Sequence, residues 1–326
     1  MNKFSHEPVL LNEIVEAFDY LKDKENAIFV DGTIGLAGHS LAIADKLKAK
    51  SSEFRVIAID KDEEAIRIAK LRTKDYGLRT NFSFVHDDFH NIKSILSELD
   101  IDPSTSLGAG QIDGMLLDLG VSSMQLDNKD RGFSFEDPNA PLDMRMDPTQ
   151  NKSAKDILNN YPITELEGML YRGEEKHFKR VARNIAEFRE EKSFETVGDL
   201  VAVLEKAIPK KFGGKNFATD TFRALRIEVN DELAPLAKSI EEIIPHLQKG
   251  GKLAVITFHS LEDRIVKQTF KKLENPCECP PEFPYCTCGK KPMVKIITKK
   301  PLEPSDKEIE ENPRSRSSKF RIIEKI

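Results

Sequence analysis

The sequence lacks the apolar segments that cross membranes or direct secretion. It holds no run of about 18 consecutive apolar residues, the length that a membrane-spanning helix needs. The stretch from Met1 to Pro8 also lacks the apolar core of a signal peptide. We therefore expect a cytoplasmic protein that makes no membrane contact.

Cysteine is scarce as well, and its distribution is uneven. All four cysteines lie in one short window, at Cys277, Cys279, Cys286 and Cys288. Such clustering in a cytosolic chain argues against a disulfide framework. Two Cys-x-Cys pairs, six residues apart, form a fair four-thiolate zinc pattern, although Cys-x-x-Cys is the more usual spacing. The sequence leaves two options open here, a structural zinc ion or four reduced thiols.

The chain also lacks the strong positive charge of a protein that coats nucleic acid. Its formal net charge is −5 over 326 residues, a length that suggests about two domains. The C-terminal stretch 290–326 departs from this balance, because it holds eleven Lys and Arg residues against six Asp and Glu residues. A local basic patch is therefore expected near the C-terminus.

The most distinctive stretch, Val30 to Ser40, reads V-D-G-T-I-G-L-A-G-H-S. It follows a short β-rich segment, 27–30, and precedes a helical segment, 41–49. Gly32, Gly35 and Gly38 allow a sharp turn and let a ligand approach bare backbone N–H groups. The pattern indicates a nucleotide-cofactor loop, although a plain βα turn that happens to contain glycines fits it too.

Strand-like and helix-like segments alternate over the first third of the chain. The strands are expected at 27–30, 54–59, 81–85 and 112–117, and the helices at 12–20, 41–49, 63–74 and 92–99. This alternation predicts βαβ units and a parallel sheet, in which ligands bind beyond the carboxyl ends of the strands. Acidic residues stand at all four of those ends: Asp31, Asp60, Asp87 with Asp88, and Asp118. Aspartate is common in turns, but four of four strand ends indicate that at least two are functional.

The alternation stops after Asp118. Residues 119–148 read as a long irregular segment, and 153–209 as wholly helical. Helical spacing resumes at 219–247. Strands are expected at 252–258, 293–298 and 319–324, and a helix ending at Leu273 separates the first of these from the other two. Side chains able to cap helix N-termini stand at Asn12, Asp62, Ser153, Thr164, Thr196 and Ser260. Two late strands without a helix between them predict that the last strand returns antiparallel.

These features predict an α/β, Rossmann-like fold of the class I S-adenosylmethionine-dependent methyltransferases, with a seven-stranded sheet and a terminal antiparallel strand. The glycines are spaced three apart and not as G-x-G-x-x-G, so the dinucleotide fingerprint is absent. We expect a methyltransferase domain in two parts, 1–122 and 216–326, around an inserted, mainly helical domain at 123–215 that contacts the substrate or serves as a simple lid.

Several long motifs resemble a known family. They are D-G-T-I-G-L-A-G-H-S, L-L-D-L-G-V-S-S-M-Q-L-D, R-G-F-S-F, P-L-D-M-R-M-D, F-H-S-L-E-D-R-I-V-K and N-P-R-S-R-S. Together they resemble the MraW family of bacterial small-subunit ribosomal RNA methyltransferases, from His6 to the C-terminal tail. The resemblance implies S-adenosylmethionine as cofactor, 16S rRNA in the small ribosomal subunit as partner, and methylation of one cytidine at N4 in the decoding region.

The resemblance also carries cofactor contacts onto this chain. They fall on Ala37, Gly38, His39, Asp60, Phe89, Asp118 and Gln125. The chemistry fits, because loop amides suit the methionine end, Asp60 suits the ribose hydroxyls and Phe89 offers an apolar wall to the adenine. Ala37 stands where the family often has glycine, which is tolerable if its φ is negative.

The reacting centre is expected near Asp118, with Ser122 and His259 as further catalytic candidates. Cytosine N4 is a poor nucleophile, so an enzyme must orient it and accept a hydrogen bond from it as planarity is lost. The Pro-Pro-Tyr turn that many amino-methyltransferases place here is missing. Ser260, Asp263 and Arg264 are candidates for the base pocket, although they are equally compatible with a capped helix start. Asp118 can also be read as a strand-end acid that only holds its own loop.

RNA contacts are expected from two cationic groups. The first is Arg314, Arg316, Lys319 and Arg321, and the second is Lys179, Arg180 and Arg183. Phe133, Phe135 or Met144 could stack on an extruded base, although core packing is the simpler role. Methylation of DNA or of another RNA, and a non-catalytic RNA-binding assembly factor, remain the alternatives. The sequence leaves the oligomeric state open, a homodimer included.

Overall fold

The computed structural model describes residues 7–48, 54–78, 81–101, 111–209, 217–280, 282 and 285–326. The chain forms two compact units, one comprising Met1–Gly120 with Leu233–Ile326 and the other Val121–Glu232. Within those ranges, no helix has the length and apolar character that crossing a membrane requires.

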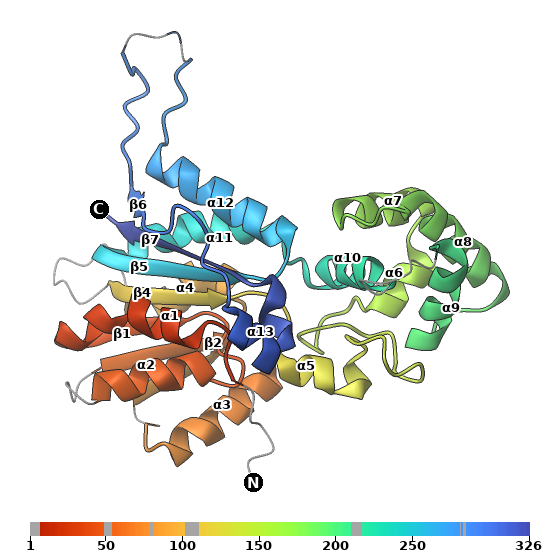
Figure 1. Ribbon diagram of the computed structural model, residues 1–326, viewed down its shortest axis with the longest axis horizontal. Helices are drawn as coiled ribbons and strands as arrows, with labels where there is room; N and C mark the ends of the chain where they lie inside the picture. The colour runs from red at the N-terminus through yellow and green to blue at the C-terminus, as the bar shows by residue number, and fades with distance from the viewer. Residues whose placement is uncertain are drawn as a thin grey trace. The chain divides into compact units, whose positions relative to one another are not determined.

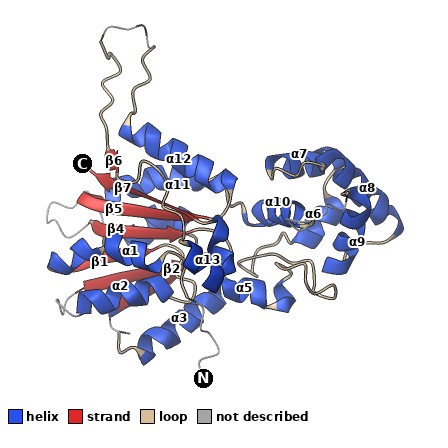
Figure 2. Cartoon of the chain, in the orientation of Figure 1, coloured by secondary structure: helices blue, strands red, loops and turns tan. Residues whose placement is uncertain are grey.

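The first unit is built on a seven-stranded sheet in the order β3-β2-β1-β4-β5-β7-β6 (Figures 1 and 2). The strands are β1 (Ala27–Asp31), β2 (Phe54–Asp60), β3 (Phe82–His86), β4 (Ile112–Asp118), β5 (Leu247–Thr257), β6 (Val294–Ile296) and β7 (Lys319–Lys325). Strands β1 to β5 pair in parallel, whereas β7 runs antiparallel to both β5 and β6. The predicted Rossmann-like methyltransferase sheet is confirmed, with its antiparallel strand inserted between β5 and β6.

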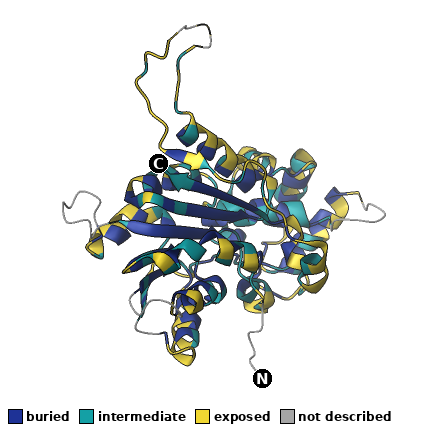
Figure 3. Ribbon diagram, turned by 60° about the vertical axis from the view of Figure 1, so that its left-hand side comes forward, coloured by how far each residue is buried: buried dark blue, intermediate teal, exposed yellow. Residues whose placement is uncertain are grey.

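Helices cover both faces of this sheet. One face carries α1 (Leu11–Ala17), α2 (Gly38–Lys48) and α3 (Glu63–Asp75), and the other α4 (Ile92–Glu98), α11 (Leu236–Ile243) and α12 (Ser260–Glu274). Successive residues of a strand point to opposite faces, so Phe29 packs into the first layer and Val30 into the second. Both faces are therefore apolar, and the central strands β1, β2 and β4 are almost wholly buried while the helices expose their outer sides (Figure 3).

The predicted N-caps have mixed outcomes. Asp62, Ser153 and Thr196 cap α3, α6 (Ala154–Asn160) and α9 (Val197–Ala207) through their side chains, as expected. The predictions for Asn12, Thr164 and Ser260 are wrong, because α1, α7 (Ile163–Arg172) and α12 have their N-caps at Leu10, Pro162 and His259. At the start of α1 the hydrogen-bond partner is distant in sequence, since the Leu10 N–H donates to the Glu308 carboxylate at 2.7 Å.

The second unit is helical. Its elements are α5 (Ser123–Asp127), α6 (Ala154–Asn160), α7 (Ile163–Arg172), α8 (Phe178–Glu191), α9 (Val197–Ala207) and α10 (Thr219–Asn230). They enclose a core of their own, to which Phe222 and Leu225 of α10 contribute. Because α10 needs this core to bury its apolar side, the unit extends to Glu232, beyond the expected boundary at Lys215.

The irregular segment of the second unit is ordered by its apolar side chains. Phe133 and Met144 are buried in the helical core, and Phe135 meets the ring of Phe222 edge-on at 5.6 Å between centroids. Core packing is thus the role of all three. The alternative that Phe133 or Met144 offers a stacking surface to a base is wrong, because neither side chain is accessible.

Candidate active site

The glycine-rich stretch lies across the carboxyl ends of the neighbouring strands. The Gly32 N–H donates to the Leu116 carbonyl of β4, and the Ile34 N–H to the Ile59 carbonyl of β2, each at 2.9 Å. The Gly35 N–H donates to Oδ2 of Asp60, also at 2.9 Å. The loop is therefore tied to both strands that flank β1, which fixes its backbone without help from a ligand.

Two glycines of this loop are required by close approach. A Cβ atom at Gly32 would lie 2.5 Å from Cδ2 of Leu117, and one at Gly38 would lie 2.4 Å from Cγ of Pro8. Real Cβ atoms essentially never come this close, so a side chain at either position would require the neighbouring Leu117 or Pro8 side chain to shift. Gly38 opens α2, whose first N–H groups carry the partial positive charge of a helix start.

Ala37 departs from its expected conformation. Its φ is +62°, in the left-handed region, so the negative φ under which alanine would be tolerable without strain is not what the structure has. An alanine in this region costs of order 1 kcal/mol that glycine would avoid. The Ala37 N–H donates to the Ile34 carbonyl at 2.7 Å, and the carbonyl of Ala37 accepts from Leu41 in the first turn of α2. The turn into α2 dictates the left-handed backbone, and the alanine adopts it despite the strain.

Two of the strand-end acids are held by the loop. Asp31 is buried and accepts hydrogen bonds from the Ser40 hydroxyl at 2.6 Å and from the Thr33 N–H at 3.2 Å. Asp60 accepts from the N–H groups of Gly35 and Asp62. Burial raises the pKa of each to about 6, and these hydrogen bonds oppose the rise. Both carboxylates thus help to shape the loop.

Asp118 at the end of β4 is different, because one of its oxygens is unpaired. Among the described residues, the buried Oδ1 atom has no hydrogen-bond partner, although the side chain as a whole is 26% exposed. Its backbone N–H donates to the Thr33 hydroxyl at 2.7 Å, which ties β4 to the glycine loop. Burial, followed by the nearby charges of Asp31 and Glu262, raises the pKa of Asp118 to about 8. The carboxyl group is therefore poised to ionise when a cation or hydrogen-bond donor reaches it.

His39 faces Asp118 from the first turn of α2. Its Nε2 atom lies 2.9 Å from the Val9 carbonyl, which can only accept, so Nε2 carries the proton. Its Nδ1 atom lies 3.6 Å from Oδ2 of Asp118. The first unit thus brings together Gly38, His39, Asp60 and Asp118, four of the residues expected around the cofactor.

Phe89, also expected at the cofactor, lies in a short 3-10 helix (Phe89–Asn91) directly after β3. Its ring is 9% exposed and belongs to the core between the sheet and α4. Its Cβ approaches the Gly32 backbone so closely that it would lie 3.2 Å from a Cβ built there. The side chain thus borders the loop while packing mainly as core.

His259, expected at the reacting centre, has a structural task at the start of α12. Its Nδ1 atom accepts from the Glu262 N–H at 3.4 Å, and its Nε2 atom lies 3.1 Å from the Glu262 carboxylate. Glu262 in turn accepts from the Phe258 and His259 N–H groups, which completes a capping box. Sequence reasoning missed both Glu262 and Thr33, although the spacing of His259 and Glu262 is that of a capping box.

The structure corrects part of the prediction for the base pocket and for the cations that contact RNA. Arg321 is buried and binds Asp263 with two hydrogen bonds, at 2.7 and 3.2 Å, and Lys319 adds a third charge at 3.6 Å. Asp263 and Arg321 are thus a structural pair, and neither a base pocket nor a phosphate contact is available to them. Arg314 and Arg316 are exposed. The second cationic group is exposed as well, on α8 of the other unit: Lys179, Arg180 and Arg183.

Ser122 and Gln125 lie in the second unit, where they hold each other. The Ser122 hydroxyl accepts from the Gln125 N–H at 3.2 Å, and the Gln125 side chain accepts from the Ser122 N–H at 3.0 Å. This capping box starts α5. It gives the Ser122 hydroxyl a structural task in addition to any chemical one.

Comparison with known proteins decides the family. The model of the MraW methylase family matches residues 3–326. The chain belongs to the MraW methylase family. Proteins named ribosomal RNA small subunit methyltransferase H from two Clostridium botulinum strains, 657 and Kyoto, are each 51% identical over 99% of this chain and the whole of their own length. Membership of this family agrees with the resemblance found in the motifs.

A solved structure adds a more distant likeness. An rRNA methylase from Streptococcus thermophilus aligns with a TM-score of 0.38 and 12% identity, over 95% of each chain. The family assignment rests on the sequence matches and not on this similarity.

Proposed function

We propose that this member of the family transfers the methyl group of S-adenosylmethionine to the N4 amino group of a cytidine in 16S rRNA of the small ribosomal subunit. The observation that carries the proposal is the Asp118 carboxyl group, with one buried, unpaired oxygen beside the glycine loop. The name shared by the relatives, ribosomal RNA small subunit methyltransferase, supports the class of substrate.

The residues of the first unit fit a cationic, nucleoside-containing cofactor. S-adenosylmethionine supplies a methyl group activated by a positively charged sulfur. An unpaired carboxylate oxygen can accept a hydrogen bond from the ammonium group of this cofactor and attract its positive sulfur. The N–H groups at the start of α2 suit a carboxylate, and Asp60 keeps free lone pairs on both oxygens for ribose hydroxyls. In the second unit, Gln125 is the residue expected to add a cofactor contact.

Asp118 would act on the amino group by accepting its hydrogen bond. The lone pair of cytosine N4 is delocalised into the ring, so attack requires the amino group to lose planarity while its N–H groups stay bound. An ionised carboxylate accepts such bonds, whereas the neutral acid is a poorer acceptor. Ionisation of Asp118 therefore serves cofactor binding and nucleophile orientation together. His39, facing Oδ2, would position the carboxyl group and not react itself.

The exposed cations supply sequence-independent contacts to the RNA backbone. Arg314 and Arg316 offer them on the first unit, and Lys179, Arg180 and Arg183 on the second. Phosphate contacts fix the position of an RNA, while the choice of base depends on its surroundings in the folded target. An acidic protein can therefore act on rRNA when its target is presented by a folded particle.

The test is transfer of labelled methyl groups to small subunits purified from cells that lack this activity. Subunits, free 16S rRNA and DNA are compared as acceptors, and the label is mapped by nuclease digestion and mass spectrometry. We expect label at cytidine N4 of one nucleotide in small-subunit rRNA. Label on DNA, on another RNA or on another atom would refute the substrate assignment.

Two variants test whether transfer depends on Asp118. Asp118→Asn removes the charge while preserving the shape, and we expect it to abolish transfer. Asp75→Asn, on an exposed acid at the end of α3, is the matched control and should transfer at the wild-type rate. A wild-type protein that binds small subunits but neither binds the cofactor nor transfers a methyl group would establish the alternative, a non-catalytic assembly factor.

A further inference from the structure

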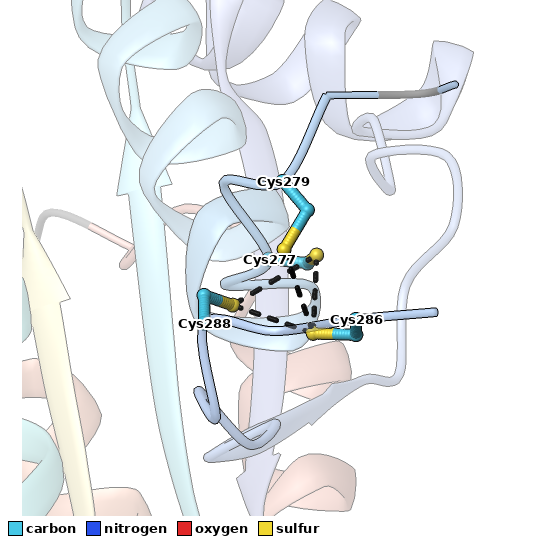
Figure 4. Close-up of side chains that lie close together, drawn as sticks. All are labelled: Cys277, Cys279, Cys286 and Cys288. Carbon is cyan, nitrogen blue, oxygen red and sulfur yellow. Dashed lines mark hydrogen bonds between the residues drawn. The ribbon is translucent and has the colours of Figure 1, made fainter. Parts of the chain in front are cut away.

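The four cysteines converge within the loop between α12 and β6 (Figure 4). Cys286 Sγ lies 3.6 Å from that of Cys277, 3.9 Å from that of Cys279 and 3.4 Å from that of Cys288. The Sγ atoms of Cys277 and Cys288 are 3.9 Å apart, and all four atoms lie within 4.8 Å of one another. None of the four forms a disulfide.

These separations match the edges of a metal-centred tetrahedron. With zinc–sulfur bonds of about 2.3 Å, the sulfur–sulfur edges measure about 3.8 Å. A disulfide would instead bring two sulfurs to about 2.05 Å. We propose that Cys277, Cys279, Cys286 and Cys288 bind one zinc ion, as a structural site separate from the methyl-transfer centre.

The donor set narrows the choice of metal. Four thiolates are soft ligands, and a tetrahedral sulfur site favours zinc or iron over magnesium, calcium or manganese. Four protein ligands also fill the coordination sphere of zinc, which leaves no position for water or substrate. The site is therefore structural. The Thr287 N–H donates to Cys279 Sγ at 3.3 Å, the kind of contact that orients a thiolate ligand.

The described residues of this loop lack an apolar core that would hold its shape. Between Leu273 and Val294, none of the described residues is buried, so no apolar core forms there. An ion pair between Glu278 and Lys290, at 2.5 Å, joins the two Cys-x-Cys arms, but both side chains are exposed and solvent screens their attraction. A metal ion bound by both arms closes the loop far more firmly than this pair, because metal binding supplies folding energy directly.

The experiment uses the full chain purified without chelators. Elemental analysis is expected to find one zinc per chain, lost in the variant with Cys279→Ser and Cys286→Ser. Tyr285→Ser, which changes an 81% exposed side chain in the same loop, is the matched control and should keep the zinc. Circular dichroism of each variant checks that the rest of the chain remains folded.

Thiol titration gives an independent readout, because the chain has no cysteine outside this cluster. We expect four thiols that react slowly until a strong chelator or mercurial releases the metal. Replacement by Co²⁺ should give the visible absorption of tetrahedral thiolate coordination. Four readily reactive thiols without metal, disulfides in the freshly purified protein, or iron in place of zinc would each overturn the proposal.

Discussion

The raised pKa of Asp118 predicts that cofactor affinity depends on pH in a defined direction. With a pKa of about 8, this carboxyl group is protonated at neutral pH in the free protein. A cation attracts only the ionised form, so binding of S-adenosylmethionine should strengthen as pH rises toward the pKa of the free protein. Asp31, Glu262 and His39 face the same group, and the two acids reinforce the effect by opposing a further negative charge.

The size of the expected change in cofactor affinity follows from the fraction of Asp118 that is ionised. This fraction is about 1% at pH 6 and about 90% at pH 9, so affinity should rise on the order of 90-fold between these values. That ratio corresponds to about 2.7 kcal/mol. A close ion pair at an effective dielectric constant of about 20 gains about 4 kcal/mol. The attraction therefore exceeds the ionisation cost, and at pH 7 the cofactor should bind with release of close to one proton from Asp118.

Isothermal titration calorimetry measures both quantities, with proton release obtained from buffers of different ionisation enthalpy. S-adenosylhomocysteine is the control ligand, because it keeps the rest of the molecule but lacks the positive sulfur. The ratio of the two affinities isolates that charge, and it should rise with pH for the wild type and stay flat for Asp118→Asn. A flat wild-type ratio between pH 6 and 9, or an equal slope in the variant, would refute the assignment of the charge-sensing role to Asp118.

Three further predictions concern stability. The pKa of Asp118 is higher in the folded than in the unfolded chain, so this group favours the folded state at low pH, and the contribution is lost as pH rises from the unfolded pKa through the folded pKa. Asp118→Asn should therefore be more stable than wild type at pH 8, by a few kcal/mol in order of magnitude, and this gain should shrink toward pH 4. Urea unfolding at both pH values checks this. The free energy of unfolding of Ala37→Gly should stay within about 1 kcal/mol of wild type although the variant lacks a buried methyl group, because relief of the left-handed backbone strain offsets that loss. A decrease above about 2 kcal/mol would show that the conformation is unstrained. Arg321→Ala should lower the free energy of unfolding by about 1–3 kcal/mol in urea unfolding, because the buried Asp263 carboxylate would keep only Lys319, at 3.6 Å, as a cationic partner. Arg316→Ala, at an exposed cation, should leave stability unchanged and weaken RNA binding.

The sheet was predictable because its signals are local and strong. Strands β1, β2 and β4 are short apolar runs that end in an aspartate, and they begin at Ala27, Phe54 and Ile112 as expected. The first residue of a helix was less predictable where the hydrogen-bond partner of its N-cap lies far away in the sequence. The N–H group of Leu10 is satisfied by Glu308, a pairing between opposite ends of the chain that no local pattern contains. Boundaries set by tertiary contacts therefore lie beyond single-sequence reasoning.

For the candidate site, residue type identified the acids but not their separate tasks. Asp31, Asp60 and Asp118 all end parallel strands, so their residue type and position alone do not rank them, although the motifs favour Asp60 for the ribose and Asp118 for the reacting centre. The structure ranks them by what occupies their oxygens, since loop N–H or hydroxyl groups bind the first two and leave Oδ1 of Asp118 unpaired among the described residues. Its pKa is consequently the highest of the three.

Charge in the C-terminal stretch illustrates why residue type alone misleads. Arg314, Arg316 and Arg321 look alike as cations within one basic segment, yet only the first two are exposed. Strand β7 alternates its side chains between two faces, and pairing with β5 places Arg321 opposite Val255, where the Asp263 carboxylate of α12 binds it. A cation committed to a buried carboxylate cannot also neutralise a phosphate. The positive charge available to RNA on this segment is therefore smaller than its composition suggests, and recognition has to depend more on the shape of the folded target.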